Sequence, residues 1–181
     1  TQNIENLSNI EKIQKAANSD YLTDLPNRRA FICDAEIVVA ENISEKTPYA
    51  LAILDIDYFK KVNDNYGHDA GDHMLKVFSL YLRKHFGNGL ISRLGGEEFA
   101  VLISGLDEDQ LYNRFDDFRR SISVSQISFE QQQINFSVSL GMIYNSHETL
   151  AKQMSLADGA LYYAKENGRN QISIVGAIEE S

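Results

Sequence analysis

The sequence contains one cysteine, Cys33, among its 181 residues. A single cysteine excludes an internal disulfide framework, and such sparing use is typical of a reducing compartment. No apolar run approaches the roughly 18 consecutive residues that a membrane-spanning helix needs. The first residues also lack the charged and apolar regions of a secretion signal. We therefore expect a domain without an internal disulfide and without a membrane span among these residues.

Positive charge is also scarce: 17 Lys and Arg stand against 26 Asp and Glu, which gives a net charge of −9 at pH 7. This balance argues against a module that binds duplex nucleic acid or an anionic membrane, because such modules need a basic face. A single anionic small molecule remains compatible if a metal or a local basic pocket supplies the counter-charge. Hydrophobic residues at 43% and charged residues at 24% indicate one globular domain, without repeats or low-complexity segments.

Apolar periodicity predicts strands interleaved with helices. Residues 47–57 form a near-continuous apolar run that is typical of a buried strand. The Gly95-Gly96 pair between apolar runs at 90–94 and 97–103 indicates a β-hairpin. Further strands are expected at 127–130, 134–144 and 171–175, and helices at 1–19, after the turn at 20–27, at 58–67, at 73–86, around 111–118 and at 148–165. The pattern predicts an α/β or α+β domain with a mixed or antiparallel sheet.

Acidic residues stand at two strand ends. Asp55 and Asp57 end the buried strand, and Glu97 and Glu98 follow the hairpin glycines. Gathered carboxylates repel one another unless a cation lies between them, and Mg²⁺ prefers such oxygen ligands together with phosphate oxygens. Each acid taken alone could instead be solvated or cap a helix. A lysine from the pair 60–61 could neutralise a phosphate beside the acids, while the other faces solvent.

Asn63, His68 and Asp72 follow in the next helix-turn-helix. Asn and Asp side chains can bind a purine edge, and an Asp carboxylate can accept two N–H groups from guanine. Asp72 could also be the N-cap of the helix at 73–86. Both the dinucleotide-binding G-x-G-x-x-G and the P-loop motif are missing, so neither of those loops holds a phosphate here.

Five runs, in this order and spacing, resemble the GGDEF family of diguanylate cyclases: DYLTDLPNRR, DIDYFKKVNDNYGHDAGD, RLGGEEF, SVSLG and ALYYAKENGRN. The resemblance covers about residues 20–175. It implies a palm-like fold, with a central, mainly antiparallel sheet flanked by helices and a GGEEF β-hairpin. It also implies condensation of two GTP into cyclic di-GMP and two pyrophosphates, where two copies of the domain meet antiparallel, each holding one GTP.

The resemblance also implies roles for individual residues. Two Mg²⁺ or Mn²⁺ ions would be held by the Asp55 carboxylate, the Ile56 carbonyl, Glu97 and, with less weight, Glu98. Glu97 would act as general base, and Lys60 would stabilise charge on the transferring phosphoryl group. The substrate-binding residues would be Phe59, Asn63, His68, Asp72, Arg93, Gly95, Gly96, Lys165 and Arg169. Asp57 would support the site or cap the following helix.

One family feature is missing. Many members carry an R-x-x-D product-inhibition site before the glycine pair, and Phe86 and Gly89 occupy those positions here. Neither side chain can bind guanine or phosphate as Arg and Asp do, so feedback inhibition through that site should be absent or weak.

The main alternative to the active cyclase is a GTP-binding sensory or interaction domain without turnover. Asp72, an acid suited to guanine, argues against a cyclase with altered base choice. A structural domain without ligand does not explain why the acids gather beside glycines. We expect residues 1–19 to be a helical connector from an upstream region, 20–176 the cyclase domain and 177–181 a tail. The chain begins with Thr1, which suggests a fragment of a longer protein. We expect the fragment in the cytoplasm, and the full protein tethered, if at all, to the inner membrane through its upstream region.

Overall fold

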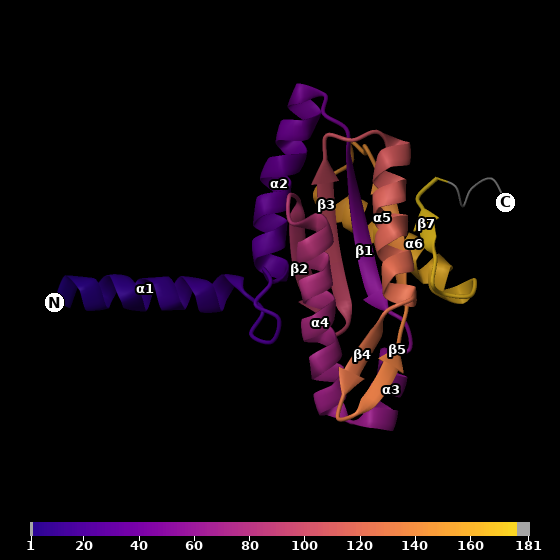
Figure 1. Ribbon diagram of the computed structural model, residues 1–181. Helices are drawn as coiled ribbons and strands as arrows, with labels where there is room; N and C mark the ends of the chain where they lie inside the picture. The colour runs from indigo at the N-terminus through magenta and orange to yellow at the C-terminus, as the bar shows by residue number, and fades with distance from the viewer. Residues whose placement is uncertain (1, 177–181) are drawn as a thin grey trace.

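A five-stranded sheet with the order β2-β3-β1-β6-β7 forms the centre of the fold in a computed structural model that describes residues 2–176 (Figure 1). Thr1 and the expected tail at 177–181 lie outside the described residues. The strands are β1 (Tyr49–Ile56), β2 (Leu90–Gly95), β3 (Glu98–Ser104), β6 (Val138–Tyr144) and β7 (Ile172–Ile174). Only the β6–β7 pairing is parallel, which confirms the expected mainly antiparallel sheet and its GGEEF hairpin.

Helices cover both faces of the sheet. Helices α2 (Arg28–Glu45) and α6 (Leu150–Glu166) pack on one face, where Phe31 and Leu161 join Leu51 and Ile53 of β1 in a buried cluster. Helices α4 (His68–Phe86) and α5 (Glu108–Ser123) cover the other face (Figure 1). Successive residues of β1 therefore point into different cores, which explains why this strand is apolar throughout.

The second core contains a cluster of aromatic rings. Phe78 of α4 lies 4.8 Å from Phe99 of β3 and 5.6 Å from Phe118 of α5, measured between ring centroids. All three side chains are fully buried. Tilted and edge-on pairs of this kind add to the apolar burial that holds the two helices on the sheet.

The expected start of the helix at 73–86 was wrong. Helix α4 begins at His68, so Asp72 lies in its second turn and is not an N-cap. Within its first turns, Gly71 is a buried helical residue whose added Cβ would lie 1.9 Å from Asn63 Oδ1. The close approach of α4 to the preceding helix, α3 (Phe59–Tyr66), therefore requires glycine at this position.

The expected strand at 134–144 is divided into two. Residues before the break form β5 (Gln132–Asn135), which pairs with β4 (Gln126–Phe129) in a separate hairpin. At the break, the Ser137 carbonyl accepts a hydrogen bond of 2.9 Å from the Asp57 backbone N–H. This bond ties the chain to the end of β1 before β6 begins. Apolar alternation continues across the break, so periodicity alone could not reveal it.

Helix α1 (Gln2–Asn18) extends away from the rest of the domain (Figure 1) and has no buried residue. Its apolar side chains at Ile4, Leu7, Ile10 and Ile13 are between 51% and 73% exposed. The expected short helix is thus confirmed, with its apolar side chains open to solvent. Within residues 2–176, the helices are all too short or too polar to cross a lipid bilayer.

Candidate active site

The end of β1 brings acidic and basic residues together. Asp55 lies directly opposite Glu98 of β3 in the antiparallel register. Lys165, in the last turn of α6, places its Nζ 2.5 Å from Asp55 Oδ1, and both side chains are largely buried. A residue expected to bind phosphate therefore neutralises a residue expected to bind metal. The predicted phosphate-binding and metal-binding residues therefore touch through the Lys165–Asp55 ion pair.

Asp55, Glu97, Glu98 and Lys165 form a group that we call the acidic corner, where burial and like charge disfavour the ionised forms of Asp55 and Glu98. Burial raises the pKa of Asp55 to about 6, even though the hydrogen bond and charge of Lys165 lower it, and the negative charges of Glu97 and Asp57 add to the rise. Burial likewise raises the pKa of Glu98, with the charges of Asp158 and Asp55 acting in the same direction. Additional positive charge would therefore stabilise the ionised forms of these acids.

The glycine hairpin folds back against the end of β1. Gly95 and Gly96 have φ angles of 148° and 54°, which residues other than glycine rarely adopt. The Ile56 N–H donates to the Glu97 carbonyl at 3.3 Å, so Glu97 lies beside the predicted metal ligands. An added Cβ at either glycine would have no neighbour within 4 Å, which leaves the space beside the turn open.

Arg93 holds this hairpin in place. Its Nε donates to the Gly96 carbonyl at 2.9 Å, and its Nη1 lies 3.1 Å from both carboxylate oxygens of Asp20. The Arg93 side chain is 10% exposed. In this structure the expected substrate-binding arginine is therefore occupied in fixing the hairpin to the segment before α2, and Asp20 explains part of the run DYLTDLPNRR.

The predicted guanine-binding residues lie on the helix pair α3–α4. Asn63 is held against Gly71, the residue before Asp72, and Phe59 packs against the same glycine. His68 and Asp72 are exposed on α4. Asn63 is thus fixed by packing against the residue before Asp72, whereas the Asp72 side chain is open to solvent.

Lys60 does not contact the acidic corner. Its side chain is 91% exposed and lies 3.8 Å from Asp64 on the same helix. The neighbouring Lys61 places its Nζ 4.4 Å from the centroid of the Tyr58 ring. The role of Lys60 in phosphoryl transfer stays a prediction.

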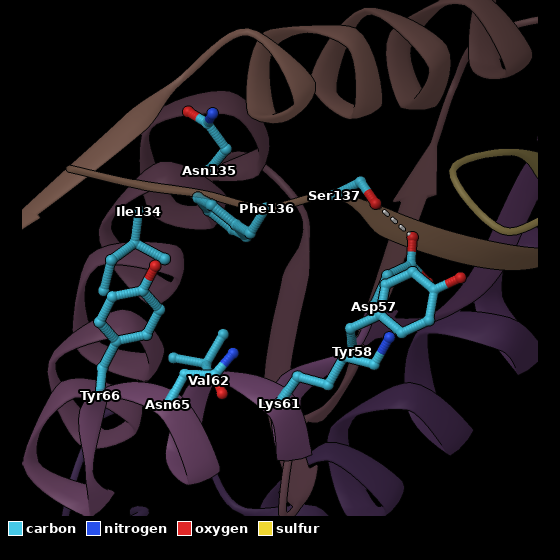
Figure 2. Close-up of a pocket in the computed structure, with 10 residues that line it drawn as sticks. All are labelled: Asp57, Tyr58, Lys61, Val62, Asn65, Tyr66, Ile134, Asn135, Phe136 and Ser137. Carbon is cyan, nitrogen blue, oxygen red and sulfur yellow. Dashed lines mark hydrogen bonds between the residues drawn. The ribbon is translucent and has the colours of Figure 1, made fainter.

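Asp57, predicted from sequence only to support the site or cap a helix, is a buried acceptor of several hydrogen bonds. The residue is 2% exposed, and it accepts hydrogen bonds from Ser137 Oγ at 2.7 Å, Ser139 Oγ at 2.7 Å and the Asn170 N–H at 3.0 Å. Figure 2 shows the Ser137 contact at one end of a cavity of about 360 Å³ between α3 and residues 134–137. The polar alternation in SVSLG was the signal that could have identified these partners.

The positions of the family's inhibition motif are packed into the fold. The Phe86 side chain is fully buried and its ring lies 5.1 Å from those of Phe115 and Phe118. An added Cβ at Gly89 would lie 2.5 Å from the Leu102 carbonyl oxygen. The Phe86 ring therefore cannot reach a ligand in solvent, and a side chain at Gly89 would require the neighbouring backbone of β3 to shift.

The donor set of the acidic corner fits a magnesium-type ion. No three His, Cys, Asp or Glu side chains of residues 2–176 form a complete metal-binding cluster. Mg²⁺, however, commonly takes only one or two protein carboxylates and completes its shell with water and phosphate oxygens. A buried carboxylate with a pKa raised to about 6, next to Glu97, provides such ligands and requires a counter-charge.

Comparisons with known proteins assign the family. The family model described as diguanylate cyclase, GGDEF domain, matches residues 17–171, and the chain belongs to this family. It is 32% identical over 178 residues to the probable diguanylate cyclase DgcF of Escherichia coli, covering 94% of this chain and 56% of DgcF. It is 34% identical to the diguanylate cyclase DgcP of Pseudomonas aeruginosa, covering 92% of this chain and 25% of DgcP.

Solved structures of GGDEF domains have the same fold as this chain. The coiled coil and GGDEF domain of DgcB from Caulobacter crescentus, in complex with c-di-GMP, superimposes with a TM-score of 0.88 at 28% identity, covering 96% of this chain and 94% of that one. The active GGEEF domain of a diguanylate cyclase from Vibrio cholerae gives a TM-score of 0.76 at 28% identity, covering 82% and 96% of the two chains. The expected palm-like GGDEF fold is thus confirmed.

Proposed function

We propose that this domain is an active diguanylate cyclase that condenses two GTP into cyclic di-GMP and two pyrophosphates. The observation that carries the proposal is the corner where Asp55, Glu98 and Lys165 meet beside the glycine hairpin. The family's motifs supply every residue type that the reaction requires there. In each half-reaction, the 3′-hydroxyl of one GTP forms a bond to the α-phosphorus of the other, and the bond to pyrophosphate breaks.

Metal binding and proton acceptance would fall to the residues at the end of β1 and in the glycine hairpin. Asp55, the Ile56 carbonyl, Glu97 and Glu98 would hold Mg²⁺ or Mn²⁺, two ions per site. When bound, such ions neutralise phosphate charge and lower the pKa of an attacking hydroxyl. Glu97 would accept the hydroxyl proton as general base.

The chain's own cations and amides would bind and orient GTP. Lys165 and Arg169 would bind the terminal phosphates, and the Lys165 ammonium would exchange its contact with Asp55 for one with phosphate. The Asp72 carboxylate would accept hydrogen bonds from guanine N–H groups, and the Asn63 amide would bind the guanine edge beside His68. Gly95 and Gly96 would leave room for the triphosphate.

Turnover requires a second copy of the domain, because each copy would hold one GTP. The exposed apolar side chains of α1 support this requirement, since a helix that buries none of its residues gains stability by packing against another. We assign residues 1–19 to a connector and 20–176 to the catalytic domain. Because the chain spans about half of DgcF and a quarter of DgcP, the input signal belongs to the whole protein.

The test is release of pyrophosphate from GTP in the presence of Mg²⁺. The proposal predicts release with GTP and much less with ATP, at a rate per protein molecule that rises with protein concentration as pairs form. Binding of GTP without pyrophosphate release, at concentrations where the protein is dimeric, would favour a sensory domain without turnover.

A further inference from the structure

The segment after α6 has an unusual backbone. Gly168, Arg169 and Asn170 have φ angles of 113°, 62° and 46° in succession. Two consecutive non-glycine residues in the left-handed region are unfavourable and persist only where neighbouring groups fix them. This segment carries Arg169, whose side chain the proposed function assigns to the terminal phosphates. The groups that fix the segment therefore also decide where Arg169 is placed.

Two anchors hold Asn170. Its N–H points at Asp57 Oδ2, 3.0 Å away, and at Ser139 Oγ, 3.1 Å away. Its carbonyl and its side-chain Oδ1 accept hydrogen bonds from Arg119 Nη1 of α5, at 3.1 and 2.9 Å. Asp116 in turn pairs with Arg119 at 2.8 Å. The segment is thus fastened to the end of β1 on one side and to α5 on the other.

Of the two anchors, Asp57 is the one that lies next to the predicted metal-binding and phosphate-binding residues. It follows Ile56, whose carbonyl is a proposed metal ligand, and it precedes Tyr58, whose ring lies 4.6 Å from the Arg169 guanidinium. Among the ion pairs of residues 2–176, Asp57 takes part in none, so its charge is balanced only by hydrogen bonds from neutral donors. A buried carboxylate held in this way fixes the direction of every donor around it.

We propose that Asp57 is a positioning residue, which couples the metal-binding end of β1 to the segment carrying Arg169 and so sets the affinity for the terminal phosphates of GTP. The inference rests on the proposed function. It assigns Asp57 no contact with substrate or metal. Its effect should therefore be confined to the part of the substrate that Arg169 binds.

The variant Asp57→Asn tests this, because it keeps the shape of the side chain and removes its charge. Calorimetric titration in Mg²⁺ would compare a GTP analogue, bridged by methylene between the α and β phosphorus atoms, with GMP. We expect the variant to lose about tenfold or more in affinity for the analogue, the effect of weakening a hydrogen bond to a charged group. Affinity for GMP, which lacks the terminal phosphates, should change by less than about twofold.

Further variants separate positioning from a general loss of structure. Ser139→Ala removes a contact to both Asp57 and Asn170 and should weaken analogue binding more than Ser137→Ala, which contacts Asp57 alone. The exposed Asp117→Asn on α5 is the matched control and should bind both ligands as the unmodified protein does. If Asp57→Asn does not fold, the two serine variants carry the same comparison.

The outcomes are distinct. Equal losses for the analogue and GMP, or no loss for either, would overturn the positioning role and leave the cyclase proposal intact. If the unmodified protein binds neither ligand, the proposed function fails, and this inference fails with it. Selective loss of analogue affinity supports both.

Discussion

Gly141 of β6 determines how closely α6 approaches the sheet, and replacing it is a demanding test of the site's geometry. A Cβ added to Gly141 would lie 1.9 Å from the Ala157 carbonyl oxygen and 2.4 Å from the Leu161 N. Both are backbone atoms of α6, so no side-chain rotation can relieve the clash. Ordinary contact needs about 3.4 Å, so Gly141→Ala must displace α6 by an ångström or more.

The displacement should be visible in both stability and activity. Overpacking of this kind typically costs about 1 to 3 kcal/mol. For a domain of this size, that corresponds to a Tm lower by roughly 2 to 12 °C. Lys165 lies one helical turn beyond Leu161, so the shift would also move its ammonium relative to Asp55. A misplacement of about 1 Å at a reaction site can lower the rate about 100-fold.

Gly159→Ala is the matched control, because Gly159 belongs to the same helix and an added Cβ there meets nothing within 4 Å. This variant should raise the unfolding free energy by about 0.5 to 1 kcal/mol, since alanine loses less conformational entropy than glycine in a helix. Thermal unfolding followed by circular dichroism, together with pyrophosphate release, measures both effects. If Gly141→Ala matches the unmodified protein in Tm and rate, the close packing of α6 does not position the site.

Three further predictions follow from the corner and its surroundings. Burial raises the folded-state pKa of Asp55 from 3.8 to about 6. The metal-free protein should therefore gain stability as pH falls through 6, by about 1.4 kcal/mol between pH 8 and pH 5 relative to Asp55→Asn. Urea unfolding measures this, and a difference in unfolding free energy between the two proteins that stays constant with pH would contradict it. Micromolar cyclic di-GMP should leave the initial rate unchanged, since the buried Phe86 ring and Gly89 present no group that binds guanine or phosphate, and strong inhibition would contradict this reasoning. Asp72→Ser should raise the rate with ATP relative to GTP by about tenfold, the effect of losing hydrogen bonds to a charged acceptor, and an unchanged ratio would remove its guanine-binding role.

Much of the fold could be predicted from apolar periodicity. The buried strand at 49–56, the glycine hairpin and the amphipathic helices have patterns that depend only on which side chains face the core. The misplaced boundaries depend on contacts between segments distant in sequence. Helix α4 extends back to His68, where Gly71 permits the close approach of α3, and the Ser137 carbonyl accepts a hydrogen bond at the end of β1 just before β6 begins at Val138.

The site could be predicted in part for the same reason. Its acids and glycines stand in recognisable motifs, so Asp55, Glu97 and Lys165 are candidates from sequence, and the structure brings Asp55 and Lys165 into contact. The strained backbone at Arg169 and Asn170, the pairing of Arg93 with Asp20 and the buried hydrogen bonds of Asp57 are three-dimensional facts. No local pattern shows which polar residue will be buried and which donors will surround it.

The most direct test of the proposed activity is mass spectrometry of the products formed from GTP and Mg²⁺, at protein concentrations where two copies would pair, alongside Glu97→Ala. The account predicts cyclic di-GMP with two pyrophosphates for each molecule formed, and a rate at least about 100-fold lower in the variant, as expected for loss of a general base. Absence of the cyclic product from the unmodified protein, or equal product from both proteins, would contradict it.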